Sequence, residues 1–298
     1  MQGADAIAAE RLKDITEKVH NLPTPPLVFT QIIKVINNPK ASANEIGAII
    51  AEDPALTAKV LKLINSSYYG MSSTITSVKQ AILILGLDAI KSLVISTSVF
   101  DSFTRNKVLD RAYLGNFWRH SLLTALMAKI VAKSVQRGFL FDSELAFSGG
   151  LLHDIGKLVI ISHLPDEYPL IKEISEQEPA LPEIDIEFNV LQFTHSDLGS
   201  YIAAKWNLPP EISFAILYHH YKEGISADSF SAIIHLADQL AHKNDFPNDP
   251  IIEKSNPFYE EVWEILGLDP SAEEQMLEQL KNDYAKAETF MKMAQGAA

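Results

Sequence analysis

The 298-residue chain contains no cysteine, which excludes disulfide bonds and thiolate metal sites. This composition fits a reducing compartment, and we expect a cytoplasmic protein. A long uninterrupted hydrophobic run is also missing, because Gly86, Asp88, Lys91 and Ser92 break the longest apolar stretch, at residues 81–99. The first residues carry acids early and have no hydrophobic signal core, so we expect neither export nor membrane association.

Positive charge is scarce as well. The chain has 25 Lys and Arg against 38 Asp and Glu, a formal net charge of −13, which argues against sequence-independent binding of nucleic acid or of an anionic membrane. Residues 77–85, Gly86 and residues 88–100 have the outline of a helix-turn-helix motif. The second of these segments offers one lysine among many apolar residues, so we expect a buried helix and no nucleic-acid partner.

Strand signals are few, since the sequence shows no sustained alternation of polar and apolar residues and no Asn-Gly hairpin turn. Helix signals are frequent. Ser42 and Glu45 have the spacing of a capping box, and Asp53-Pro54 places a capping acid before a proline of the first helical turn. The predicted fold is therefore all-α. The expected helices cover residues 5–22, 26–36, 44–52, 54–64, 77–85, 88–100, 112–136, 143–161, 195–206, 211–220, 230–242 and 260–293.

Three parts are expected along the chain. A polar stretch at residues 101–110 suggests a boundary, which gives an N-terminal helical subdomain (1–105), a multi-helical bundle (106–245) and a C-terminal loop with a polar helix (246–298). The boundary stretch is short and is not rich in Gly or Ser, so the N-terminal part should pack on the second part.

The strongest candidates for a functional site are His153 and Asp154, which follow the apolar run at residues 145–152. Polar groups in such a setting need partners, and metal coordination is one common solution. Further residues of the same type are scattered along the chain, and a helical bundle could gather them into one pocket. These residues are His120, His195, His219, His220 and Asp238.

We assign His120, His153, Asp154 and Asp238 to one divalent metal ion. A second ion would share a bridging Asp154 and add His195, His219 and His220. Mixed nitrogen and oxygen ligands suit iron, manganese, nickel, zinc or magnesium, so the sequence leaves the metal open.

Two ions in such a site would bind phosphate oxygens and generate hydroxide for in-line attack on phosphorus. Lys157 lies one helical turn after Asp154 and could hold the same phosphate, so these two residues are the candidate catalytic residues. A histidine taken singly is more often an ordinary hydrogen-bonded residue than a ligand. We give this reading to His20, His163, His235 and His242.

The histidine and aspartate pattern resembles the HD superfamily of metal-dependent phosphohydrolases, and more closely the HDOD family, the HD-related output domain of bacterial signalling. The resemblance covers residues 22–242. Matching segments in the first half are Leu22-Pro-Thr-Pro-Pro26, the run from Asp53-Pro-Ala-Leu to Asn65-Ser-Ser-Tyr-Tyr-Gly70, and Ala81-Ile-Leu-Ile-Leu-Gly-Leu87. Those in the second half are Phe117-Trp-Arg-His120-Ser, Gly150-Leu-Leu-His153-Asp-Ile-Gly-Lys157, His195-Ser-Asp-Leu-Gly-Ser with Trp206-Asn-Leu-Pro209, and His219-His220.

The resemblance implies an all-helical, HD-like bundle and a regulatory or scaffolding role. Many members of the family have lost metal ligands, whereas this chain keeps a residue of ligand type at every HD position that can be matched. We therefore expect a signal-transduction output module with a retained metal pocket that binds a signalling protein or a nucleotide. The alternative is a metal-dependent phosphohydrolase acting on a nucleotide or another phosphoester.

The cyclic-di-GMP-cleaving relatives differ from this chain at two points. Their Gly-Tyr-Pro signature is missing after His219-His220, where Tyr221-Lys-Glu-Gly-Ile stands. Asn116 occupies a position where some of them have a glutamate, one turn before His120. We therefore do not expect a phosphodiesterase of the Gly-Tyr-Pro type.

Overall fold

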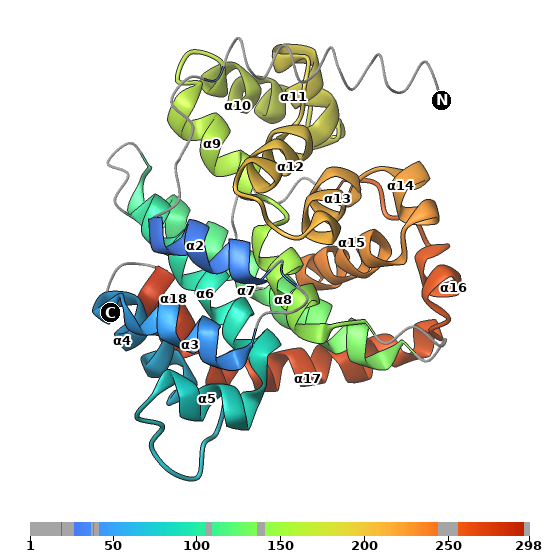
Figure 1. The fold of residues 1–298 in the computed structure, drawn as a ribbon. Coiled ribbons are helices and arrows are strands. Elements are labelled where there is room, and N and C mark those ends of the chain that lie inside the picture. The colour runs from blue at the N-terminus through green and yellow to red at the C-terminus, as the bar shows by residue number, and fades with distance from the viewer. Residues whose placement is uncertain are drawn as a thin grey trace.

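The computed structural model describes residues 19, 27–36, 38, 42–104, 109–135, 141–243 and 256–294. Within these ranges the regular structure is helical and no strand occurs, which confirms the predicted all-α fold (Figure 1). The α-helices are α2 (Leu27–Ile36), α3 (Ala43–Ala51), α4 (Pro54–Ile64), α5 (Val78–Leu85), α6 (Leu87–Thr104), α7 (Arg111–Ser134), α8 (Ser143–Leu152), α9 (Ile155–His163), α10 (Tyr168–Gln177), α11 (Glu183–Leu191), α12 (His195–Lys205), α13 (Pro210–Tyr218), α14 (Lys222–Ala227), α15 (Ser229–His242), α16 (Val262–Leu266), α17 (Glu273–Lys286) and α18 (Glu288–Ala294). A short 3-10 helix, η1, spans Pro270–Ala272.

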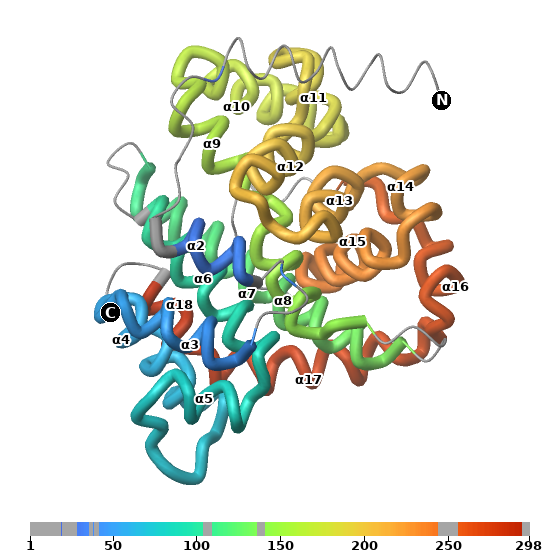
Figure 2. The backbone as a smooth tube through the Cα atoms, in the orientation of Figure 1, coloured from blue at the N-terminus to red at the C-terminus, as the bar shows by residue number. Residues whose placement is uncertain are grey.

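Helices α7 and α8 form the centre of the molecule. Figure 2 shows α2–α6 on one side of them, α9–α12 above and α13–α16 on the other side, while α17 runs beneath. Helix α7 packs against α8, α15, α17 and α18, and most of its side chains are buried. A helix that is buried over most of its surface is suited to this central position.

The N-terminal helices begin where the sequence predicts them. The Ser42 hydroxyl accepts the Glu45 amide, and the Glu45 carboxylate accepts the Ser42 amide at 2.7 Å, which completes the capping box of α3. The Asp53 carboxylate accepts the amides of Ala55 and Leu56 at the start of α4. Such caps satisfy amides that have no partner within the helix.

The next boundary lies between α5 and α6. Helix α6 begins at Leu87, and the Asp88 carboxylate lies in its first turn and pairs with Lys91 at 2.8 Å. Gly86, between the two helices, has a positive φ of 86° and an extended ψ of 166°. Ile90, Leu93 and Val94 of α6 are buried, as we expect for a core helix.

The segment after α4 links the N-terminal helices to the end of the chain. Asn65 holds the loop closed, since its side chain donates to the Ile75 carbonyl at 2.8 Å and accepts the Ile75 amide at 2.7 Å. Tyr68 then packs edge-on against Phe290 of α18, with ring centroids 5.7 Å apart. The N-terminal helices also pack on the second part, where the Ser148 hydroxyl of α8 donates to that of Ser92 at 3.0 Å.

The C-terminal region is not the single polar helix that we predicted. It is divided into α16, η1, α17 and α18, with Gly267 in the left-handed region at the end of α16. Met276, Leu280 and Phe290 are buried, and α17 and α18 both pack on α7. Their apolar residues are too widely spaced to dominate the composition, so the sequence appears more polar than the packed face is. The expected helix at residues 5–22 lies outside the described residues, except for the buried Val19.

The predicted helix at residues 143–161 is in fact two helices, α8 and α9, which meet at His153 and Asp154. Asp154 has φ −101° and ψ 9°, so the helix is interrupted there. Gly156 explains the tight approach of the next segment, because a Cβ at this position would lie 2.0 Å from the His195 carbonyl oxygen. Only glycine lets α9 and the start of α12 come this close.

The same stretch, Ser143–His163, is the one segment of the described residues that is long and apolar enough to cross a membrane. Of its most apolar window, 83% is buried inside the protein. We interpret it as core, because it is broken at Asp154 and packs against α7 and α12.

Candidate metal centre

The histidines and aspartates that the sequence singles out come together in the structure. They lie at helix ends or on inward faces: His120 on α7, His153 and Asp154 at the α8–α9 junction, His195 at the first position of α12, His219 and His220 after α13, and Asp238 on α15. They form two groups whose ligand atoms all lie within 4.8 Å of one another. We call His120, His153 and Asp238 the outer cluster, and Asp154, His195, His219 and His220 the inner cluster.

The outer cluster centres on one carboxylate oxygen. Asp238 Oδ1 lies 3.1 Å from His120 Nε2 and 3.4 Å from His153 Nε2. The two Nε2 atoms are themselves 3.2 Å apart. These atoms therefore converge on a single point, as the ligands of one ion do.

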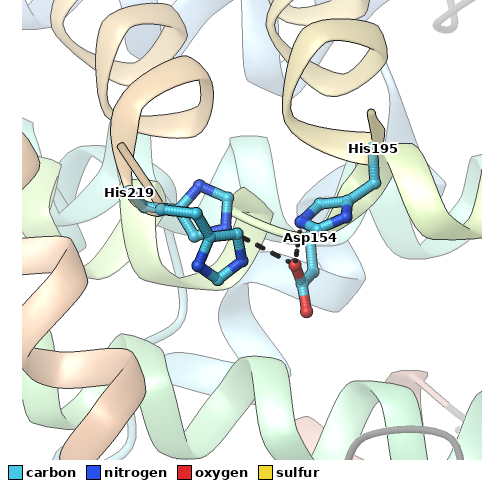
Figure 3. Close-up of side chains that lie close together, drawn as sticks. Asp154, His195 and His219 are labelled. Atoms are coloured by element: carbon cyan, nitrogen blue, oxygen red, sulfur yellow. Dashed lines mark ion pairs between the residues drawn. The ribbon is translucent and has the colours of Figure 1, made fainter. Parts of the chain in front are cut away.

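The inner cluster is shown in Figure 3, where His195 of α12 and His219 after α13 approach Asp154 from two sides. Asp154 Oδ1 lies 3.2 Å from His195 Nε2 and 3.6 Å from His219 Nε2. The other oxygen, Oδ2, lies 3.3 Å from His153 Nε2 in the outer cluster. The Asp154 carboxylate thus has the position of a bridge, one oxygen toward each cluster.

Hydrogen bonds on the far side of the rings fix which nitrogen faces the centre. The Nδ1 atoms of His153 and His219 lie 2.7 Å from the carbonyls of Gly150 and Ile216, and the Nδ1 of His195 lies 2.8 Å from a Glu187 carboxylate oxygen. A carbonyl or carboxylate can only accept, so Nδ1 carries the hydrogen. The Nε2 atoms then face the clusters, as is typical of metal-binding histidines.

Several buried atoms at the centre have no hydrogen-bond partner: Asp154 Oδ1, His195 Nε2, His219 Nε2, His220 Nδ1 and Asp238 Oδ1. Leaving one such group unsatisfied costs about 1–3 kcal/mol, so their gathering at one place calls for an explanation. A divalent cation bound by nitrogen and oxygen donors would satisfy them together. The residues present therefore fit a metal site, and the donor types leave the metal open.

The metal-free rings do not share one protonation state. Burial alone would lower the pKa of every ring, but Asp154 and Asp238 raise that of His153 to about 9, and Glu187 and Asp154 raise that of His195 to about 10. Burial prevails at His120 and His219, whose pKa values fall to about 4. Burial also lowers the pKa of His220 well below its ordinary value, so in the absence of metal two of the five rings favour the protonated form and three favour the neutral form.

Lys157 lies beside the centre but is not free. Its amine contacts Asp154 Oδ2 and Glu183 Oε2, each at 2.8 Å. Burial would lower its pKa, yet these two carboxylates raise the pKa of Lys157 well above its ordinary value. The amine is therefore charged and already shared by two acids.

The sequence analysis did not identify three residues that contact the candidate metal centre. Glu187 and Glu183 support His195 and Lys157, but both lie on α11, which the histidine pattern does not reach. Asn256 donates from Nδ2 to His220 Nε2 at 2.9 Å, although it follows the clusters by many residues. A lone acid or amide of this kind has no pattern that distinguishes it from a surface residue.

The histidines outside the assigned set behave differently from one another. His235 is satisfied by ordinary hydrogen bonds to the His219 carbonyl and the Tyr259 amide, as the sequence analysis expected. His163 is half-buried and its Nδ1 lies 2.7 Å from the Ser162 hydroxyl. His242 lies closer to the centre than we expected, with Nε2 at 3.4 Å from Asp238 Oδ1 and its ring 4.4 Å from that of His120. His20 lies outside the described residues.

Comparison with known families agrees with this geometry. A family model of the HDOD domain matches residues 22–222. The chain belongs to the HDOD family. The match includes helices α2 to α13 and ends at residue 222, before α15, which carries Asp238.

Solved structures show the same fold. An HDOD domain protein with unknown function from Geobacter sulfurreducens is 25% identical, with a TM-score of 0.74 over 97% of this chain and 96% of that one. A candidate signal transduction protein from Marinobacter aquaeolei VT8 is 21% identical, with a TM-score of 0.77 over 97% and 66%. A candidate phosphohydrolase from Shewanella amazonensis SB2B is 23% identical, with a TM-score of 0.72 over 96% and 98%.

One curated relative is similar in sequence, an uncharacterized protein of Treponema pallidum (strain Nichols). It is 26% identical over 226 aligned positions, and the match covers 73% of this HDOD chain. The chain spans 42% of the length of that relative.

Proposed function

We propose that this HDOD protein is a signal-transduction output module that holds one or two divalent metal ions and binds a signalling protein or a nucleotide. In this role the ions stabilise the arrangement of α7, α8, α12, α13 and α15, from which the clusters are built. Metal binding to a folded site adds to folding stability, so the module would be rigid when loaded.

The observation that carries the proposal is the pairing of Lys157. A phosphate-binding amine must be free to meet the phosphate, but the Lys157 amine is held by Asp154 and Glu183 at 2.8 Å each. Lys157 is also buried, with 6% of its surface exposed. This arrangement favours a binding role over turnover, in agreement with the missing Gly-Tyr-Pro signature.

A second candidate is a metal-dependent phosphohydrolase acting on a nucleotide or another phosphoester. It is favoured by the bridging position of Asp154 between two complete clusters. Two divalent ions held in this way would supply charge stabilisation and an activated water for attack on phosphorus. The chain itself would contribute the Asp154 carboxylate as the bridge and, after release from Glu183, the Lys157 amine as a phosphate contact.

The test combines metal content, melting temperature and turnover on a panel of nucleotides and simple phosphoesters. The wild type is compared with Asp154→Ala and with Asp185→Ala, a matched loss of an exposed acid on α11. For the proposed module, Asp154→Ala loses metal and melts at a lower temperature, and no substrate is turned over. Turnover by the wild type that vanishes in Asp154→Ala but persists in Asp185→Ala would overturn the proposal in favour of the hydrolase.

A further inference from the structure

A cavity of about 200 Å³ lies next to the metal centre, on the far side of Lys157. It is enclosed by α9, α10 and α11, which lie together at the top of Figure 1, and by Tyr113 of α7. None of the histidines of the two clusters lines it. The cavity is therefore separate from the place where the ions would bind.

The walls of the cavity are largely apolar. Ile160, Ile171 and Ile186 line it together with the phenol rings of Tyr113 and Tyr168. An apolar cavity of roughly 150 Å³ is enough to hold a benzene ring. The size and lining thus fit a ligand group with a single ring or a short branched chain.

The polar groups at the cavity carry an excess of negative charge. Glu176, Glu183 and Glu187 line it, opposed by Lys157 and Lys172, while Glu187 is also paired with His195 outside the cavity. Lys157 is already shared with Asp154, so it cannot balance Glu183 alone. Burial, and also the neighbouring Glu187, raise the pKa of Glu183 in spite of Lys157, as expected for an acid that lacks full compensation.

We propose that this cavity binds a small organic cation, an amine or ammonium compound with one ring. The ring would occupy the space between the isoleucines and the tyrosines, and the positive group would meet Glu183 and Glu176. Aromatic walls stabilise organic cations further, because the face of a tyrosine ring attracts positive charge. A few placed polar groups in an apolar cavity are the usual basis of small-ligand recognition.

The cavity is connected to the metal centre through two of its own residues. Glu183 contacts the Lys157 amine, which in turn contacts the bridging Asp154. Glu187 contacts Nδ1 of His195, an inner-cluster residue. We therefore expect a cation in the cavity to oppose metal binding by charge repulsion, and this second part rests on the metal-binding function proposed above.

The binding part is tested by calorimetry on the full chain stripped of metal, with benzylamine as the probe. Benzyl alcohol has a similar shape without the charge, and benzoate has the opposite charge. We expect benzylamine to bind about threefold or more tightly than benzyl alcohol, and benzoate not to bind. Equal binding of benzylamine and benzyl alcohol, or no binding of benzylamine, would overturn the proposal.

Substitutions of partly exposed lining residues locate the site without disturbing the core. Glu176→Gln should weaken benzylamine binding about two- to fivefold, and Lys172→Gln should strengthen it by a similar factor. Ser175→Phe should block the cavity and abolish binding. Glu173→Gln, on the same helix but not lining the cavity, is the matched control and should leave the affinity unchanged. A loss of affinity in Glu173→Gln as large as in Glu176→Gln would place the amine elsewhere and overturn the assignment.

The connection to the centre is tested by repeating the titration with saturating Mn²⁺. We expect Mn²⁺ to weaken benzylamine binding about fivefold or more, and benzylamine to weaken Mn²⁺ binding by the same factor, because such coupling is reciprocal. If Mn²⁺ binds and the two affinities are independent, the coupling is refuted. If none of Mn²⁺, Fe²⁺, Ni²⁺, Zn²⁺ and Mg²⁺ binds while benzylamine does, the metal-binding function fails and the cation site stands.

Discussion

The inner and outer clusters meet at Asp154 but differ in how the protein supports and encloses them. Inner-cluster residues have between 0% and 3% of their surface exposed, and His195 is held by a carboxylate, Glu187. The outer cluster reaches the edge of the fold, where His120 is 7% exposed and the neighbouring His242 side chain 24% exposed. We infer that the inner cluster is the tighter metal site and that exchange with solvent takes place at the outer one.

The largest effect is expected when Asp154, the residue that both clusters share, is changed. Asp154→Asn should reduce the metal content of the purified protein to background. It also takes from Lys157, His153 and His195 one of the two acids that each of them contacts, and breaking a buried pair of this kind costs about 3–5 kcal/mol. Metal analysis and thermal melts check this, with Asp185→Asn as the control. Retention of one ion by Asp154→Asn would show that the carboxylate is not a bridge.

A backbone change should disrupt the inner cluster selectively. Gly156→Ala places a methyl group 2.0 Å from the His195 carbonyl oxygen, so α12 must move away from Asp154. We expect a loss of about 1–3 kcal/mol in unfolding free energy, and more if the backbone cannot shift. Denaturant unfolding measures this change in unfolding free energy. The contrasting variant is Gly47→Ala in α3, where the added carbon lies 3.5 Å from Ile82 and should stabilise the helix by up to about 1 kcal/mol.

The support of His195 can be weakened without changing any proposed ligand. Glu187→Gln keeps the shape of the side chain but removes the negative charge at Nδ1 of His195. Losing an outer-shell partner of this kind usually lowers metal affinity about 10- to 100-fold. A metal titration should show that only the tighter site weakens. Glu223→Gln, an exposed position on α14, is the control, and weakening of the looser site would reverse the assignment of the clusters.

The pH dependence should differ between the metal-free and the loaded protein. His153 and His195 hold their protons up to about pH 9 and 10 in the fold but only to about 6.5 when unfolded, so their stabilisation is complete below 6.5 and is lost as the pH rises through 9–10. His120 and His219 have lowered pKa values of about 4, so stability is lost as the pH falls from 6.5 through 4. The melting temperature of the metal-free protein should therefore peak near pH 6.5.

Metal binding requires unprotonated nitrogens, so the stabilisation by Mn²⁺ should grow as the pH rises from 6.5 toward 9. Melts in EDTA and in Mn²⁺ over this range provide the comparison. A melting temperature in EDTA that rises steadily to pH 10 would contradict the protonated state of His153 and His195.

The smallest effect is expected at the edge of the outer cluster. His242→Asn removes a ring that touches Asp238 and His120 but lies outside the two groups of converging ligand atoms. We expect less than about a tenfold loss of affinity, at the looser site, together with faster exchange of the ion. Stopped-flow release of metal to a chelator measures the rate. His163→Asn is the control, and equal effects in both variants would remove His242 from the site.

Much of the fold follows from local signals in the sequence. The capping box at Ser42, the cap at Asp53 and the buried character of α6 were all predictable, because each depends on residues a few positions apart. The break between α8 and α9 could not be predicted from local signals. The apolar pattern continues through Leu158, and the interruption is imposed by the approach of His195 to Gly156, which is a tertiary contact.

The candidate site shows the same division. Histidines and aspartates after apolar runs are conspicuous in sequence, and the structure brings the predicted set together. The sequence analysis assigned Lys157 to phosphate binding because of its spacing from Asp154. That spacing could not reveal the ion pair of Lys157 with Glu183, which lies on a different helix. The positions of His242 and Asn256 likewise depend on tertiary packing, of α15 and of the residues from 256 onward.

The wide spread of the cluster residues along the chain has a consequence for biosynthesis. His120 and Asp238 belong to one cluster but leave the ribosome far apart in time, and the helices between them must dock before either cluster exists. Contacts between such distant residues form late in folding. We therefore expect the nascent polypeptide to fold first and to acquire its ions afterwards, so that newly made molecules pass through a metal-free folded stage.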